Sequence, residues 1–225
     1  MRSVKRLVRI ASWWSMDYLY AGIWQVRAFF DRTDPASFLS GSRTPLVILP
    51  GVYETWKFMQ PLVEAAHEAG HPVHVIEPLR RSQRPVVEMA QHVTDYLQRA
   101  SLEDVVLVAH SKGGLVGKQT MVGPSGDRVR GMLAIATPFG GSRYARLMFA
   151  VPTLRIFSPR DATIIALGRE AAVNERIVSL YAGFDPHIPE RSELAGAVNI
   201  MLDTGGHFRI LADPRVQEEL EKLAH

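Results

Sequence analysis

Residues 105–114 read Val-Val-Leu-Val-Ala-His-Ser-Lys-Gly-Gly. The apolar run at the start is typical of a strand buried in a parallel sheet, and helical spacing begins at Lys112. The residues between them predict a sharp turn from strand to helix, with Ser111 at the apex and Gly113 two positions later. This pattern, with Ala109 in place of a first glycine, is the one that raises a reactive serine above a sheet. The alternative is a serine that only caps the helix.

Short apolar runs alternate with helical spacing on both sides of this turn. We expect strands over residues 46–49, 72–76, 104–109, 131–137, 177–184 and 197–202. We expect helices over residues 54–69, 86–100, 112–121 and 214–223. Apolar strands separated by helices predict an α/β fold whose central sheet is mostly parallel and covered by helices on both faces. Sites in such sheets form at the carboxyl ends of the strands.

The length of 225 residues suits one domain with a full core, and 47% hydrophobic with 22% charged residues is typical of a globular protein. We expect that domain over residues 46–225, after a linker over 31–45 that Pro35 and Pro45 interrupt. The segment 141–173 separates two expected strands. It is predicted either as a short helical cap or as a helix that covers the sheet.

The first thirty residues are rich in aromatic and basic side chains and lack proline, so residues 1–30 predict one helix. Asp17, Gln25 and Arg27 argue against a membrane span. The apolar run that begins at Ile10 is too short for a secretory signal. Two interpretations stay open: the helix packs on the rest of the chain, or it lies on a membrane surface as a peripheral anchor.

Composition excludes several other classes of function. The net charge is only +3 and no basic stripe lies on a recognised module, so we expect no nucleic-acid partner. The chain has no cysteine, which excludes disulfides and fits a cytoplasmic location, with membrane association left open. The histidines lack ligand spacing, so we expect no metal, and nothing in the sequence calls for a cofactor.

Position along the chain selects a base and an acid to accompany Ser111. A base is expected after the last strand, where residues 203–208 read Asp-Thr-Gly-Gly-His-Phe, so we predict His207, with His187 as its rival. The acid should precede that histidine. Asp185 follows the expected strand 177–184 and is our prediction. The alternatives are Asp203, interpreted as a turn residue, and Asp161, interpreted as a helix cap.

Residues 109–114, Ala-His-Ser-Lys-Gly-Gly, and 137–142, Thr-Pro-Phe-Gly-Gly-Ser, resemble the lipase and esterase branch of the α/β-hydrolase superfamily. The resemblance covers about residues 45–223. It implies the α/β-hydrolase fold and a serine hydrolase that cleaves acyl or lipid-like carboxylic esters through an acyl-enzyme. Related hydrolases carry their acid in a segment similar to Asp-Pro-His-Ile-Pro at 185–189, which supports Asp185.

The resemblance also implies an oxyanion hole made of two backbone N–H groups. One belongs to Lys112, and the other to Val52 in the loop after the first core strand. Pro50 stands where related hydrolases usually have histidine, so an ordinary Pro-Gly turn is the alternative there. We expect the substrate to contact Tyr53, Phe139, Tyr144, Leu147 and Met148.

The same triad also serves acyltransferases and thioesterases, and a hydrolase fold can bind a lipid or a partner without catalysis. The complete set of serine, aspartate and histidine favours an enzyme. The expected partner is a small-molecule or lipid ester, as in lipid metabolism.

Overall fold

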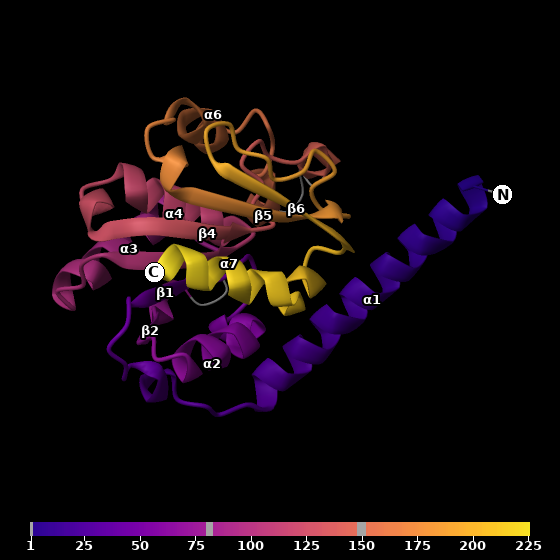
Figure 1. Ribbon diagram of the computed structural model, residues 1–225. Helices are drawn as coiled ribbons and strands as arrows, with labels where there is room; N and C mark the ends of the chain where they lie inside the picture. The colour runs from indigo at the N-terminus through magenta and orange to yellow at the C-terminus, as the bar shows by residue number, and fades with distance from the viewer. Residues whose placement is uncertain (1, 80–82, 148–151) are drawn as a thin grey trace.

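The computed structural model describes residues 2–79, 83–147 and 152–225 (Figure 1). Within these residues the sheet has six strands, all parallel, in the order β2-β1-β3-β4-β5-β6. The predicted parallel α/β fold is therefore confirmed. The strands are β1 (Leu46–Leu49), β2 (Val73–Val75), β3 (Val105–His110), β4 (Val129–Ile135), β5 (Ile177–Phe184) and β6 (Val198–Gly205).

Helices cover both faces of the sheet (Figure 1). They are α1 (Arg2–Phe30), α2 (Gln60–Glu68), α3 (Val86–Arg99), α4 (Lys112–Val122), α5 (Pro152–Arg155), α6 (Ala162–Arg169) and α7 (Pro214–Ala224). The 3-10 turns are η1 (Pro35–Phe38), η2 (Trp56–Met59), η3 (Glu77–Leu79), η4 (Gly126–Arg128), η5 (Arg143–Leu147), η6 (Asn174–Arg176) and η7 (Arg209–Ala212).

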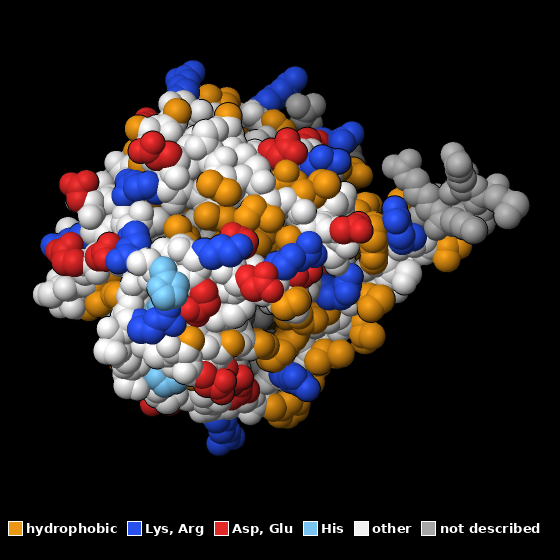
Figure 2. Space-filling model, in the orientation of Figure 1, with side chains coloured by type: hydrophobic (Ala, Val, Ile, Leu, Met, Phe, Trp, Pro, Cys, Tyr) orange, Lys and Arg blue, Asp and Glu red, His pale blue; other side chains and the backbone are white. Residues whose placement is uncertain are grey.

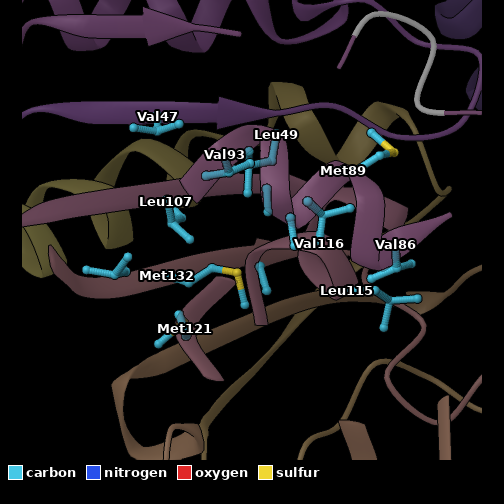
Figure 3. Close-up of a cluster of buried hydrophobic side chains, with 14 of the residues drawn as sticks. Val47, Leu49, Val86, Met89, Val93, Leu107, Leu115, Val116, Met121 and Met132 are labelled. Carbon is cyan, nitrogen blue, oxygen red and sulfur yellow. The ribbon is translucent and has the colours of Figure 1, made fainter. Parts of the chain in front are cut away.

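Two buried clusters of apolar side chains hold these layers together. Val47, Leu49 and Leu107 point toward α3, α4 and α6, and Figure 3 shows this cluster. Leu46 and Ile48 belong to the opposite cluster, with side chains of α2 and α7. Successive strand residues face opposite sides of a sheet. Both faces of β1 and β3 are covered, which explains why their sequences are apolar without interruption.

The strand order creates a crevice between the ends of β1 and β3. The chain runs from β1 outward to β2, then crosses back past β1 to β3 and continues in the other direction to β6. The helices that follow β1 and β3 therefore cover opposite faces of the sheet, so the loops after these strands diverge. Ligand sites of open α/β sheets form at such switch points.

Helix α1 packs on the body along one narrow face and extends beyond it at the N-terminal end (Figure 1). It contacts β6, η2 and η7. Asp17 is fully buried in this contact, with Ile10, Trp13 and Trp24 half-buried on the same face. The opposite face carries an exposed apolar stripe, which Figure 2 shows as hydrophobic side chains gathered along the helix; its residues are Met16, Leu19, Ile23, Val26 and Phe30. Within the described residues, none of the helices has the length and apolar character that crossing a membrane requires.

The segment 141–173 divides into two parts with different surroundings. Leu154 and Phe157, which follow η5, lie against a large pocket. Ile164 and Leu167 of α6 instead belong to the core on the face of the sheet that α3 and α4 cover. Asp161 caps α6, as interpreted from the sequence, because its carboxylate accepts a hydrogen bond from the backbone N–H of Thr163 at 2.9 Å.

The end of β6 differs from the expectation. The strand continues to Gly205 instead of ending at residue 202, so Asp203 lies exposed within the strand and not in a turn. This part of β6 is an edge strand with one face open to solvent, and its polar residues made it resemble a loop in the sequence.

Leu107→Ala should test the role of β3 as the centre of the core. Leu107 lies on β3 between β1 and β4, and its side chain is fully buried in the core on one face of the sheet. Its truncation leaves a cavity and should lower the free energy of unfolding by about 2–5 kcal/mol, measured by urea denaturation. Val87→Ala on the exposed surface of α3 is the control and should change it by less than about 0.5 kcal/mol. Equal losses in the two variants would contradict this assignment.

Candidate active site

Ser111 occupies a strained turn between β3 and α4. Its backbone has φ 52° and ψ −120°, a left-handed conformation that is costly for a residue other than glycine. The glycines that follow it make room for this turn. A Cβ on Gly113 would lie 2.0 Å from the carbonyl oxygen of Leu49, and one on Gly114 would lie 2.0 Å from Thr137 Oγ1. The small residues are therefore required by the close approach of β1 and of the loop after β4.

Hydrogen bonds connect Ser111, His207 and Asp185 in a line. His207 Nε2 lies 3.0 Å from Ser111 Oγ, and His207 Nδ1 lies 2.8 Å from Asp185 Oδ2. The three residues follow β3, β5 and β6, so the parallel sheet brings them together at the carboxyl ends of its strands. All three are buried. In this arrangement the serine hydroxyl can donate its proton to Nε2 while Nδ1–H donates to the carboxylate.

Backbone donors hold the Asp185 carboxylate in place. Its Oδ1 accepts hydrogen bonds from the N–H groups of His187 at 2.7 Å and Ile188 at 3.0 Å. Burial alone would raise the pKa of Asp185. The charge and hydrogen bond of His207, with the backbone hydrogen bond from His187, outweigh burial and hold the pKa of Asp185 below its ordinary value. The carboxylate is therefore ionised and able to fix the imidazole.

The same interaction acts in the opposite direction on His207. Burial alone would lower the pKa of His207, but the charge and hydrogen bond of Asp185, with Glu54 and Asp17, raise it above its ordinary value. His187, the rival from the sequence, lies beside it with ring centroids 4.7 Å apart. Burial and the neighbouring His207 lower the pKa of His187 to about 4, and its Nε2 lies 3.2 Å from the hydroxyl of Tyr18. The structure thus places His207, and not His187, on Ser111.

A second buried network lies beneath the first. His110 Nδ1 is 2.8 Å from Glu54 Oε2, and His110 Nε2 is 2.9 Å from the carbonyl oxygen of His207. Nε2 therefore donates to the carbonyl oxygen of His207, while Nδ1 faces the Glu54 carboxylate. Glu54 also accepts a hydrogen bond from Gly51 N–H at 2.8 Å, so the pair joins the loop after β1 to the loop of His207. No local pattern in the sequence pointed to Glu54.

The two predicted oxyanion donors flank the crevice. Lys112 begins α4, so its backbone N–H lies at the positive end of the helix. Its side chain is buried elsewhere: Nζ donates to the carbonyl of Arg84, and burial lowers the pKa of Lys112 to about 8. Val52 lies in the loop after β1 and lines the pocket beside Ser111.

A pocket of about 760 Å³ opens over Ser111 and His207. Of the predicted contact residues, Tyr53 and Tyr144 line it. Phe139 instead packs in the buried core on the face of the sheet that α3, α4 and α6 cover, and does not line the pocket. Met148 and the side chain of Leu147 lie outside the described residues. Aromatic side chains that the sequence did not assign to the pocket also line it: Trp14, Tyr18, Phe184 and Phe208.

The part of the chain that the structure describes holds no group of three or more His, Asp or Glu side chains suited to a metal ion. The histidines nearest to His207 are instead engaged with protein acceptors and hydroxyl groups.

Comparison with known proteins gives a structural match only. No protein-family model matches the chain, and no curated protein matches its sequence. The lipase BlEst2 of Bacillus licheniformis is similar, with a TM-score of 0.61 and 16% identity over 87% of this chain and 95% of the lipase. Lipase B of Aspergillus fumigatus has a TM-score of 0.64 and 19% identity, over 86% of this chain and 56% of its own. The α/β-hydrolase enzyme MGS-MChE2, from a lagoon-sediment metagenome, has a TM-score of 0.58 and 16% identity, over 81% of this chain and 90% of its own.

Asp185→Asn should lower the pKa of His207. The variant removes the charge and the acceptor that raise this pKa and leaves the burial that lowers it, so the imidazole should lose its proton at a lower pH. An NMR titration of the histidine rings measures the change. Asp127→Asn, on the surface at η4, is the control and should leave it unchanged. An unchanged or higher pKa in Asp185→Asn would contradict the assigned electrostatics.

Proposed function

We propose that this chain, which has the α/β-hydrolase fold, is a serine hydrolase that cleaves carboxylic esters. One observation carries the proposal: the side chains of Ser111, His207 and Asp185 form an unbroken line of hydrogen bonds at the base of a large pocket. A buried carboxylate, an imidazole and a hydroxyl in this order are the parts that nucleophilic acyl transfer needs. The fold alone supports no reaction, because many activities share it.

In the first step Ser111 Oγ attacks the ester carbonyl while His207 Nε2 takes the hydroxyl proton. The new C–O bond converts the carbonyl oxygen to an oxyanion. Asp185 stabilises the imidazolium that forms and keeps Nδ1 protonated. The tetrahedral carbon then expels the alcohol, to which His207 returns the proton, and the acyl group stays on Ser111.

The oxyanion needs donors that are already in position. We assign this role to the backbone N–H groups of Lys112 and Val52. The assignment is supported by the location of Lys112 at the start of α4 and of Val52 in the pocket wall. Both elements are anchored at the switch point of the sheet, so the donors need no reorganisation as charge develops.

In the second step water attacks the acyl-enzyme, again with His207 as base. The acid is released, Ser111 recovers its proton, and the site returns to its initial state. Water is the acceptor in this proposal.

The pocket supports an acyl or lipid-like ester as the substrate. Its volume of about 760 Å³ exceeds what a small acetyl group requires, and aromatic rings form much of its wall. Trp14 and Tyr18 of α1 and Phe157 from the segment before α6 surround the space above Ser111. Such walls favour an apolar chain over a charged or peptide group.

We also propose that α1 contacts an anionic lipid surface. The apolar stripe of α1 points away from the body, with Leu19 64% and Phe30 73% exposed. Arg9 and Arg27 are exposed on the same helix, and its one acidic residue, Asp17, is buried. Apolar and basic side chains together match the interface of a membrane with anionic lipids. Because α1 also lines the pocket, docking of the helix would bring the pocket to the lipid ester.

Ser111→Ala should abolish hydrolysis of p-nitrophenyl acyl esters, with kcat lower by a factor on the order of 10⁶, because the nucleophile is lost. A fluorophosphonate probe should label the wild type at Ser111 and leave the variant unlabelled.

Ser125→Ala is the matched control. This serine is also buried but lies at the far end of α4 from the pocket, so activity and labelling should stay at wild-type values. Wild-type hydrolysis by Ser111→Ala would refute the assignment, and a wild type that neither labels nor hydrolyses would favour a non-catalytic binding protein.

Leu19→Glu with Val26→Glu should abolish flotation with vesicles that contain phosphatidylserine, because two carboxylates then interrupt the apolar stripe. Hydrolysis of a short soluble ester should persist, since neither side chain lines the pocket. The control is Val87→Glu with Val198→Glu, which alters two exposed valines elsewhere and should float like the wild type. A wild-type chain that stays unbound at every lipid composition would end the membrane proposal.

A further inference from the structure

We infer that Asp17 of α1 is a positioning residue, which holds the main chain of the loop that presents His207 to Ser111. The inference rests on the proposed function and extends it. It makes the N-terminal helix part of the catalytic centre, because a residue near the start of the chain orients a group near its end.

The Asp17 carboxylate accepts three hydrogen bonds from consecutive backbone N–H groups. Oδ2 lies 2.9 Å from the N–H nitrogen of His207, and Oδ1 lies 2.8 Å from those of Phe208 and Arg209. Asp17 is fully buried. A carboxylate without water around it is costly to hold unless its lone pairs are satisfied, and bonds to an ionised acceptor are stronger than neutral ones. These three bonds therefore fix the loop firmly.

The two glycines before His207 show how closely α1 approaches. A Cβ on Gly205 would lie 2.3 Å from the ring of Trp13, and one on Gly206 would lie 2.4 Å from Asp17 Oδ1. These glycines leave room for α1, because any larger residue would push the helix away from the loop.

His207 is held from the opposite side as well. Its carbonyl oxygen accepts from His110 Nε2, whose ring is paired with Glu54. The backbone N–H of His207 thus bonds to Asp17 of α1, and its carbonyl oxygen bonds to His110 of the buried His110–Glu54 pair. With both sides fixed, the imidazole has little freedom except to face Ser111 and Asp185.

Charge provides a readout that packing alone would not give. The ionisable groups around His207 are Asp185, Glu54 and Asp17, all of which raise the pKa of His207, together with the rings of His187 and His110. Replacing Asp17 by asparagine removes one of the three negative charges. The pH below which activity is lost should therefore move to a lower value.

Asp17→Asn is the first test. The amide has nearly the same shape but can present only one oxygen to three N–H groups, so its NH₂ group opposes a donor. We expect kcat for a soluble p-nitrophenyl ester to fall on the order of 100-fold, because the base is displaced, with a smaller change in KM. The rate of Ser111 phosphonylation by a fluorophosphonate should fall in parallel, and the acidic limb of the pH profile should shift downward.

Gly205→Ala is the second test and leaves Asp17 unchanged. Its Cβ should displace α1 through Trp13, so kcat and the phosphonylation rate should again fall, while the charge near His207 is conserved. Gly22→Ala is the matched control on the same helix, since a Cβ there meets nothing within 4 Å. It should retain wild-type kinetics and stabilise α1 by about 1 kcal/mol.

The fluorophosphonate reacts only with folded sites, so kcat is expressed per labelled Ser111. A partly unfolded sample therefore does not lower the kcat that is compared between variants. Wild-type kcat, phosphonylation rate and pH midpoint in both Asp17→Asn and Gly205→Ala, even with a lower melting temperature, would overturn the inference and leave Asp17 a purely structural residue. A wild-type chain that is neither labelled nor active would instead refute the proposed function, so the two failures are distinguishable.

Discussion

The hydrogen bond between Ser111 Oγ and His207 Nε2 joins residues 96 positions apart, and much of the structure serves to hold its two ends. The parallel sheet does most of this, because all its strands end at one edge and deliver their loops to the same place. The glycines after Ser111 then admit β1 and the loop after β4 to within contact distance. A site mounted on so rigid a frame needs little rearrangement when charge develops, which is the condition for effective electrostatic stabilisation.

Three buried carboxylates surround this bond, and backbone N–H groups satisfy each of them. Asp185 accepts from two such groups, Glu54 from one, and Asp17 from three. Unpaired, these charges would destabilise the fold, because burial of an ionised group is expensive. Paired in this way, they connect the loops after β1, β5 and β6 and make each loop depend on the others. The position of His207 is therefore a property of the whole network.

Local patterns in the sequence predicted much of the fold but little of this network. Apolar runs marked the buried strands, and the turn at Ser111 was visible because strained backbone requires small neighbours. Order along the chain pointed to Asp185 and His207, whose side chains the structure brings into contact with each other. Asp17 and Glu54 carry no such signal, since their partners lie far along the chain and a lone acidic residue looks like surface. Phe139 was expected in the pocket but packs in the core, because the local sequence does not show which of the two an aromatic ring enters.

The pairing of α1 with the loop of His207 also has a consequence for biosynthesis. Asp17 and His207 are 190 residues apart, so the ribosome makes one of the first elements of the site long before the last. The sheet from β1 to β5 can assemble as it emerges, but the helix must wait, with its aromatic face unpaired, until β6 and the loop after it are free of the exit tunnel. A nascent or truncated chain would thus hold most of the sheet while the loop that carries His207 still lacked its contact with α1.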